Sequence, residues 1–349
     1  MKGLILAAGR GTRLRPLSYT KPKPLLPVAN QPVIQYGINH LYNLGIREVG
    51  LVIQPGQTDM FNEYLQLENK EDLVLHYIYQ HEQKGIAHAV GQAEEFIGQD
   101  SFVLLLGDNL FDEPLFPLKE AFNTNDIHAT VMVTKVKKPK DYGIAEIKEK
   151  KIINIEEKPA KPKSNLAVCG AYIFDVHIFK AIHSITPSAR GEYEISDAIQ
   201  WLIDHNFSIN YVKASKPTFD VGTMERWLEA NQWILKKYAL PVDNDQVENS
   251  VIIPPVKIGG NCIITNSVIG PYVSIEPNTT IEECTIKNSI ILKNSHLKNI
   301  PYDITESIFG ENTKLIGKDS KNLSLHGLFS DDSSLIFSDA DETKKESNE

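Results

Sequence analysis

The chain has 349 residues, 42% hydrophobic and 23% charged, with a formal net charge of −9. This balance is typical of a globular protein of one or two domains, and the acidic charge disfavours a nucleic-acid binder, which needs a basic face. No apolar run approaches the roughly 20 residues of a membrane span, and three widely spaced cysteines predict neither disulfides nor a zinc site, so a cytoplasmic location is expected.

Up to about residue 235, short apolar segments alternate with amphipathic ones. Strands are expected at residues 4–6, 49–53, 73–78, 102–106 and 130–133, and helices at 33–44, 59–67 and 87–96. This alternation predicts an α/β fold with a Rossmann-like, mostly parallel sheet and helices on both faces. Ligands bind such sheets beyond the carboxyl ends of the strands, so the loops after Ala8 and Leu106 are expected to meet.

The middle of the chain departs from this alternation. Residues 143–148 and 152–156 are expected to form a hairpin, and residues 167–174 another strand. We expect this region to cover the ligand site and to contact a second substrate. Residues 223–237 have a helical apolar stripe.

From Val251 the pattern changes to a hexapeptide-type repeat. Isoleucines recur at intervals of six, five, six and six, at positions 258, 264, 269, 275 and 281. Such a rhythm predicts a short left-handed β-helix, with a run of ordinary β-hairpins as the alternative. We therefore expect a catalytic domain at 1–240, a β-helix at 250–337 that drives homo-oligomer formation, and a disordered acidic tail at 338–349.

The segment from Leu4 to Val28 contains a strand followed by a loop rich in glycine and basic residues. Gly9 and Gly11 allow unusual backbone angles, so exposed amides can cradle an anion, and Arg13 and Lys23 add the charge that a triphosphate requires. The segment matches neither a Walker A loop nor a dinucleotide fingerprint. The alternative is a flexible surface loop.

Two carboxylates follow apolar segments. Asp108 comes directly after the strand expected at 102–106, and Asp220 precedes the helix that Thr223 is expected to cap. Each has a structural alternative, Asp108 as a turn residue and Asp220 as part of the helix start. Their occurrence at two strand ends favours a functional pair.

Five motifs together resemble the sugar-nucleotidylyltransferase family. They are the segment from Leu4 to Val28, Gly107-Asp108-Asn109, Glu156-Glu157-Lys158-Pro159, the segment from Arg190 to Asp197, and Phe219-Asp220-Val221-Gly222-Thr223. The match spans residues 1–235, and the repeat region resembles the long form of such enzymes. Ala8 and Gln31 depart from the family pattern, where glycine and lysine are frequent.

The resemblance implies transfer of a nucleotidyl group from dTTP to α-D-glucose 1-phosphate, giving dTDP-glucose and pyrophosphate. UTP differs from dTTP by one methyl group in the base, so leakage to UTP is expected. The alternatives are a UTP- or GTP-dependent enzyme for another sugar 1-phosphate, or a non-catalytic regulatory paralogue. We expect a nucleoside triphosphate and a sugar 1-phosphate as partners, and neither a nucleic acid nor a membrane.

The resemblance also assigns roles to single residues. It implies that Asp108 and Asp220 hold Mg²⁺, which prefers carboxylate oxygens. Catalytic roles fall to Arg13 and Lys23, on the leaving pyrophosphate, and to Lys158, on the sugar phosphate. The implied substrate-binding residues are Ala8, Gly9 and Gly11 in the phosphate loop, Gln80 and Gly85 at the base, Gly143, Glu157, Val168 and Tyr172 at the sugar, and Arg190 at a phosphate.

Several of these residues have simpler interpretations. Lys158 lies in a charge run of the kind that is usually solvated. Tyr172 could be a core aromatic residue, Val168 an ordinary strand residue and Gln80 a polar surface residue. None of the ten histidines lies at a spacing typical of metal ligands.

Overall fold

The computed structural model describes residues 1–65, 67, 70–124, 126–149, 151–238, 247–317 and 324–336. It consists of two compact units. The first comprises Met1–Arg10, Pro22–Leu25 and Pro32–Asp220, and the second Gly11–Lys21, Leu26–Gln31 and the described part of Val221–Glu349. The tail expected to be disordered, 338–349, lies outside the described residues.

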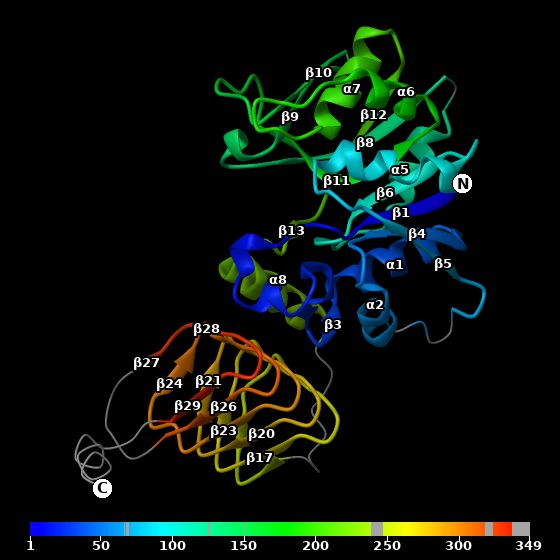
Figure 1. Ribbon diagram of the computed structural model, residues 1–349. Coiled ribbons are helices and arrows are strands. Elements are labelled where there is room, and N and C mark those ends of the chain that lie inside the picture. The colour runs from blue at the N-terminus through cyan, green and yellow to red at the C-terminus, as the bar shows by residue number, and fades with distance from the viewer. Residues whose placement is uncertain are drawn as a thin grey trace, which may run out of the picture. The chain divides into compact units, whose positions relative to one another are not determined.

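A nine-stranded sheet forms the centre of the first unit (Figure 1). Its strands are β1 (Lys2–Leu6), β4 (Glu48–Ile53), β5 (Val74–Tyr79), β6 (Phe102–Leu106), β8 (Ala129–Lys135), β9 (Gly143–Lys148), β10 (Lys151–Glu157), β11 (Leu166–Phe174) and β12 (Ile209–Lys213). The order is β10-β9-β11-β6-β1-β4-β5, with β8 and β12 extending from β11. The pairs β1–β4, β1–β6 and β4–β5 are parallel as expected. Strand β11 runs antiparallel to β6, β8 and β9, so the sheet is mixed.

Helices cover both faces of this sheet. They are α1 (Val33–Asn43), α2 (Thr58–Tyr64), α3 (Ile86–Gly91), α4 (Glu94–Ile97), α5 (Phe116–Phe122), α6 (His177–Ser184) and α7 (Ile195–Asp204). Successive strand residues point to opposite faces, so Leu4 joins the core under α3, α6 and α7, and Ile5 the core under α1 and α2. No helix in the described part of the chain is both long and apolar enough to cross a membrane.

The expected helices differ from the observed ones mainly at their ends. Helix α2 stops at Tyr64, three residues before the predicted end, and the helix predicted at 87–96 is broken into α3 and α4. Gly91 ends α3, and glycine is a poor helix former because it loses much backbone freedom. The hairpin of β9 and β10 is confirmed by their antiparallel pairing.

In the second unit, helix α8 (Met224–Tyr238) packs its apolar stripe inward. Trp227, Ala230 and Leu235 are buried, and the Trp227 indole donates a hydrogen bond to the Pro27 carbonyl at 2.6 Å in strand β2 (Pro27–Val28). The amide of Arg226 donates to the Thr223 hydroxyl, which caps the helix as expected.

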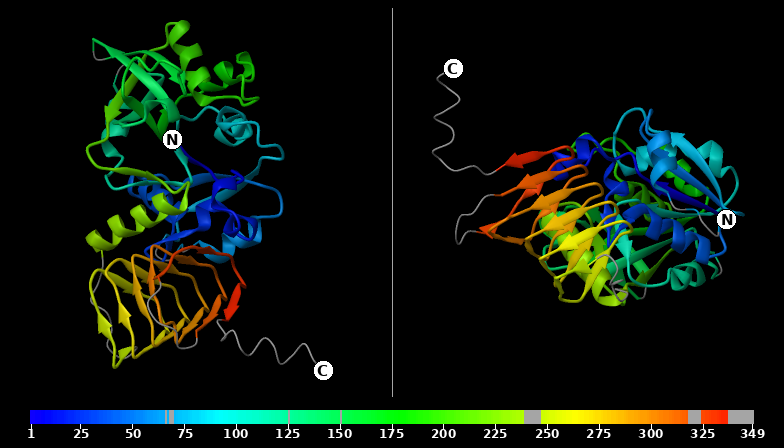
Figure 2. Two further views of the ribbon diagram at one scale, coloured as in Figure 1. Left: turned by 90° about the vertical axis from the view of Figure 1, so that its left-hand side faces the viewer. Right: turned by 90° about the horizontal axis from the view of Figure 1, so that it is seen from below.

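The C-terminal region is a β-helix of three parallel sheets, whose strands stack in successive coils (Figure 2). The first sheet contains β14 (Val247–Glu248), β17 (Ile263–Thr265), β20 (Thr280–Glu282), β23 (His296–Lys298), β26 (Lys314–Ile316) and β29 (Ser334–Ile336). The second contains β15 (Val251–Ile252), β18 (Val268–Ile269), β21 (Thr285–Lys287), β24 (Asp303–Thr305) and β27 (Ser324–Leu325). The third contains β16 (Val256–Ile258), β19 (Val273–Ile275), β22 (Ile290–Ile291), β25 (Ile308–Phe309) and β28 (Leu328–Phe329). Ile264, Ile269 and Ile281 are fully buried. Parallel pairing between coils excludes the alternative of ordinary hairpins and agrees with the left-handed β-helix expected from the repeat.

Asparagines turn the corners of the coils. Asn261, Asn278, Asn294 and Asn312 all have φ between 56° and 60°, a left-handed conformation that asparagine tolerates better than most residues. Their side-chain amides form a ladder from coil to coil, with N···O distances of 3.1–3.2 Å. The polar residues between the isoleucines therefore set the turns of the repeat.

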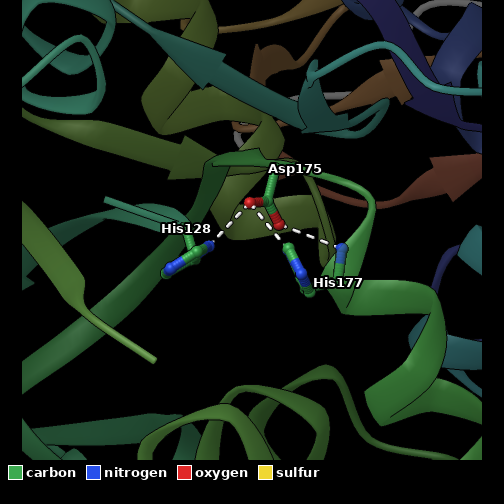
Figure 3. A group of neighbouring side chains, drawn as sticks. All are labelled: His128, Asp175 and His177. Atoms are coloured by element: carbon green, nitrogen blue, oxygen red, sulfur yellow. Dashed lines mark hydrogen bonds and ion pairs between the residues drawn. The ribbon is translucent and has the colours of Figure 1, made fainter. Parts of the chain in front are cut away.

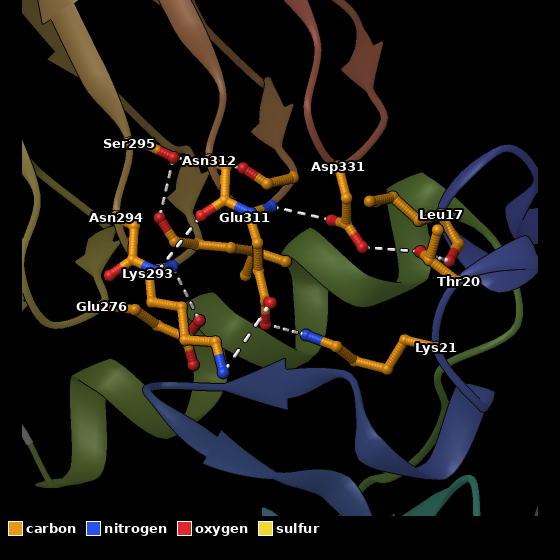
Figure 4. Close-up of polar contacts among 12 residues, drawn as sticks. Leu17, Thr20, Lys21, Glu276, Lys293, Asn294, Ser295, Glu311, Asn312 and Asp331 are labelled. Carbon is orange, nitrogen blue, oxygen red and sulfur yellow. Dashed lines mark hydrogen bonds and ion pairs between the residues drawn. The ribbon is translucent and has the colours of Figure 1, made fainter. Parts of the chain in front are cut away.

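The loop of residues 11–21 is tied to the β-helix by polar contacts (Figure 4). The side chain of Lys21 is only 4% exposed, and its ammonium forms an ion pair with Glu311. The other carboxylate oxygen of Glu311 lies 3.7 Å from Lys293 Nζ. Glu276 accepts a hydrogen bond from the Lys293 amide at 3.1 Å. Burial raises the pKa of Glu276 to about 7, although Lys21 acts in the opposite direction.

Candidate functional site

The two aspartates expected to bind a metal meet at the end of the sheet. Strand β7 (Asn109–Phe111) pairs with β13 (Thr218–Asp220), and this register places Asp220 opposite Asn109, the residue after Asp108. The pairing of two short strands therefore brings together carboxylates more than a hundred residues apart. Because β1 and β6 are parallel neighbours, Ala8 and Asp108 each lie two residues beyond paired strand ends.

Lys23 lies between these two carboxylates. Its ammonium bonds to Asp108 and, at 2.9 Å, to Asp220. The lysine side chain is 9% exposed and both aspartates are 28% exposed. Burial alone would lower the pKa of Lys23, but the two carboxylates outweigh it and the pKa is raised. Lys23 thus joins two partly exposed carboxylates, and carboxylate oxygens suit a divalent cation.

The start of the phosphate loop is held against the sheet. The Ala7 amide donates to the Val52 carbonyl at 2.7 Å, and the Gln54 side chain donates to the Ala8 carbonyl at 2.9 Å. A methyl group added at Gly9 would meet no atom within 4 Å, so the chain there is open to a ligand. Gly11, at φ 59°, and the exposed Arg13 belong to the second unit.

Glu157 is the centre of a second polar cluster, formed where β9 and β10 pair. Gly143 lies directly opposite Glu157, and a Cβ at this glycine would approach Glu157 Oε2 to 2.9 Å. The Ser196 hydroxyl donates to the same oxygen at 2.8 Å. Burial raises the pKa of Glu157, while the Ser196 bond acts to lower it. This carboxylate, held from two sides, is suited to accept hydrogen bonds from sugar hydroxyls.

Two basic residues flank this glutamate. Arg190 lies 3.5 Å from Glu157 Oε1 and donates to Glu194 at 2.7 Å. Lys158 Nζ lies 3.8 Å from the same Glu157 oxygen, and the lysine side chain is 41% exposed. Glu157 therefore holds both cations beside it, and each keeps the access to solvent that a phosphate ligand requires.

Strand β11 links the two clusters. Its backbone turns at Gly170, where φ is 74°, and the Asn109 amide donates to the Cys169 carbonyl at 3.1 Å. Val168 and Tyr172 lie on either side of this irregularity in the strand register. Tyr172 is only 3% exposed and stacks on Phe174. Tyr172 is therefore a core residue, and its contact with the sugar stays a prediction.

The residues expected at the base form a third group. Gln80 is 4% exposed, so it is no surface residue, and its side-chain amide lies 2.9 Å from His88 Nδ1. Gly85 directly precedes α3, with φ 107°, and a Cβ there would approach the Tyr193 carbonyl oxygen to 2.5 Å. Tyr193 lies in the segment that also carries Arg190 and Ser196, so one segment supports both the base and the sugar groups.

Several residues in these clusters were not identified from the sequence. Ser196 and Glu194 fall within the motif at residues 190–197, but that motif indicated only Arg190 as a ligand. Gln54 and His88 lie in no motif, and only the folded sheet brings them to Ala8 and Gln80. Each of the four contacts a residue that the family resemblance implicates.

Comparisons with known proteins agree on one family. Residues 2–237 match the family model described as nucleotidyl transferase. The chain is 34% identical to the low-salt glycan biosynthesis nucleotidyltransferase Agl11 of Haloferax volcanii over 335 residues, 90% of this chain and 94% of that protein. It is 35% identical to a glucose-1-phosphate thymidylyltransferase of Streptomyces griseus over 319 residues, 86% of this chain and 89% of that protein.

A solved structure shares the fold. The UDP-glucose pyrophosphorylase complexed with UDP-glucose superposes with a TM-score of 0.62 at 27% identity, over 68% of this chain and 99% of that one. The relatives thus include one protein named for thymidylyl transfer and one structure that contains UDP-glucose. They agree on the class of reaction and differ in the base.

Proposed function

Because the chain belongs to the nucleotidyl transferase family and is a sugar-1-phosphate nucleotidyltransferase, we propose that it transfers the nucleotidyl group of dTTP to glucose 1-phosphate and releases pyrophosphate. The observation that carries this proposal is the convergence of Asp108 and Asp220 on the Lys23 ammonium. The named activity of the Streptomyces griseus relative supports the choice of dTTP and glucose 1-phosphate.

The two aspartates fit a Mg²⁺ ion by the chemistry of their donors. Their oxygens already converge on one cationic group, and hard divalent ions prefer carboxylate oxygens. We propose that Asp108 and Asp220 would hold Mg²⁺, which supplies charge neutralisation to the phosphates when bound. Lys23 supplies part of that neutralisation from the protein itself.

The remaining chemistry requires positioning more than covalent help from the protein. The sugar-phosphate oxygen forms a bond to the α-phosphorus of the triphosphate, and the bond from that phosphorus to the oxygen bridging to the β-phosphate breaks. Lys158 would align the attacking phosphate and reduce its repulsion by the triphosphate. Arg190 would add charge beside it, and Glu157 would orient the sugar through its hydroxyls.

Other roles rest on the family motifs. Gly9, Gly11 and Arg13 would bind the phosphates of the nucleotide, with Lys23 at the leaving pyrophosphate. Gln80 and Gly85 would contact the base. His88 in α3 holds the side-chain amide of Gln80 near the start of that helix, which Gly85 precedes. The cytoplasmic location and the homo-oligomer also stay predictions.

A pyrophosphate-release panel tests the proposal. The full chain is assayed with dTTP, UTP, GTP and ATP against glucose, N-acetylglucosamine and mannose 1-phosphates, with Mg²⁺ and with EDTA. We expect the highest kcat/KM for dTTP with glucose 1-phosphate, and leakage to UTP because one methyl group discriminates by only about 1–3 kcal/mol. Higher kcat/KM with another pair would reassign the substrates, and no release with any pair would favour a regulatory paralogue.

A further inference from the structure

A cluster of two histidines and one aspartate lies outside the site described above. His128 precedes β8, Asp175 follows β11, and His177 is the first residue of α6. Because β8 and β11 are antiparallel neighbours with Phe174 opposite Ala129, their ends bring His128 and Asp175 together. His177 then enters from the start of the next helix (Figure 3).

Both imidazoles point the same nitrogen at one carboxylate oxygen. His128 Nδ1 lies 2.8 Å and His177 Nδ1 3.0 Å from Asp175 Oδ2. The three potential ligand atoms all lie within 4.8 Å of one another. In a tetrahedral site with ligands at about 2.0–2.2 Å, neighbouring ligand atoms are about 3.3 Å apart. Each histidine–aspartate edge would therefore lengthen by a few tenths of an ångström, and both imidazoles would turn from Oδ2 towards the ion.

The backbone holds all three side chains in place. The amide of Asp175 donates to the His128 carbonyl at 3.0 Å, and the His128 amide donates to the Ser208 carbonyl at 3.0 Å. The second oxygen of Asp175 accepts the His177 amide at 3.0 Å. Phe207 packs against both rings at centroid distances of 4.9 Å. This arrangement resembles the outer support that orients metal ligands, since Oδ1 is occupied and only Oδ2 faces the imidazoles.

We propose that His128, Asp175 and His177 bind one divalent transition metal ion, of which Zn²⁺ is the best match. Two imidazole nitrogens and one carboxylate oxygen suit Zn²⁺ and its neighbours, whereas Mg²⁺ prefers oxygen ligands alone. The three side chains are 22–43% exposed, which leaves access for the ion and for water to complete its coordination. The ion would join the start of β8, the end of β11 and the start of α6.

The joined elements suggest a structural role. Strand β11 carries Val168 and Tyr172, so a metal that ties its end to β8 and α6 would stabilise the strand that supports the sugar group. The competing interpretation is a hydrogen-bonded cluster without metal affinity, in which Asp175 starts the helix and both histidines donate to it. The two interpretations differ in metal binding, which is measured without any assay of catalysis.

The test uses the full chain after treatment with EDTA and dialysis. Co²⁺ is titrated while the visible d–d absorption is recorded, and Zn²⁺ binding is measured by calorimetry in the presence of excess Mg²⁺. We expect one equivalent of Co²⁺ with the absorption of a four- or five-coordinate nitrogen and oxygen site. Zn²⁺ should displace the Co²⁺, Mg²⁺ should not, and Zn²⁺ should raise the Tm in a concentration-dependent way.

Variants locate the ion. His128→Ala and His177→Ala should each weaken Zn²⁺ binding at least about 100-fold, and His128→Gln preserves size where truncation disturbs folding. The matched control is His183→Ala, which removes an exposed histidine that pairs with Glu94 at 2.8 Å. Control binding should equal that of the wild type. The absence of stoichiometric Co²⁺ binding by wild type, or undiminished binding by folded H128A and H177A variants, would overturn the proposal.

Discussion

Two buried lysines separated only by Pro22 have different surroundings. Lys23 lies between two partly exposed aspartates from strand ends of the first unit, whereas Lys21 pairs with Glu311 in the β-helix of the second. The two carboxylates beside Lys23 are each 28% exposed, so they remain accessible to a further cation. Glu311 already has two lysines and is 12% exposed. Burial and ion pairing of the lysine therefore do not distinguish a binding site from a structural contact, but the exposure of the carboxylates does.

The comparison predicts the largest effect for loss of the structural pair. Lys21→Met should lower the free energy of unfolding by about 3–5 kcal/mol, because it leaves Glu311 buried with its main partner removed. Chemical denaturation measures this loss. The control Lys287→Met removes an exposed pair with Asp303 in the same β-helix and should cost at most about 1 kcal/mol. Equal losses in the two variants would show that the Lys21 contact is not special.

At the carboxylates that surround Lys23 we expect an effect on the rate of the reaction. Asp220→Ala should lower kcat roughly 10²–10³-fold, equivalent to about 2.7–4 kcal/mol in the barrier, with the fold preserved. Pyrophosphate release measures kcat, and circular dichroism reports the fold. Asp100→Ala, at an exposed acid beside the N-terminus, serves as the control with wild-type kcat. A D220A variant that keeps most of its activity would remove Asp220 from the catalytic group.

The same size of effect is predicted for the lysine of the sugar cluster. Lys158→Ala should lower kcat roughly 10²–10³-fold, since it removes the charge proposed to align the attacking phosphate. The exposed Lys161, three residues along the same segment, provides the control Lys161→Ala. If both variants lose activity equally, general charge in this segment, and not Lys158 in particular, would explain the loss.

A smaller effect should follow from crowding the sugar cluster. Gly143→Ala places a methyl group 2.8 Å from the Ser196 hydroxyl and 2.9 Å from Glu157, so one of them must move. We expect the KM for glucose 1-phosphate to rise about tenfold, or about 1.4 kcal/mol, with little change in the KM for the nucleotide. Gly260→Ala in the β-helix meets no atom within 4 Å and should change neither. A change confined to the nucleotide KM would contradict the sugar assignment.

A further effect, on stability alone, concerns pH. The pKa of Glu276 rises from 4.5 to about 7 on folding, so the folded state keeps a proton that the unfolded state loses. Its contribution to stability is therefore complete below about pH 4.5 and is lost as the pH rises through about 7. Urea denaturation between pH 4 and 8 should show this decline. It should be weaker in Glu276→Gln, and an identical pH profile would exclude Glu276 as its source.

The sequence predicted most reliably what depends on period and on strand ends. Isoleucines at six-residue spacing identified the β-helix, and Asp108 followed a buried strand closely enough to place it at the sheet edge. The sequence did not predict that Lys23 bonds both aspartates, because the two carboxylates come together only through the pairing of β7 with β13. Nor did it indicate a histidine site, since His128 and Asp175 are 47 positions apart and meet only across a strand pair.

The most direct test of the central claim is a Mg²⁺ titration of pyrophosphate release from dTTP and glucose 1-phosphate, with wild type and with the double variant Asp108→Asn/Asp220→Asn. The two amides preserve shape but remove both negative charges beside Lys23. We predict a wild-type rate that rises with Mg²⁺ to saturation, and a double variant at least roughly 10²-fold slower at every concentration. A folded double variant with the wild-type rate and Mg²⁺ dependence would contradict the account.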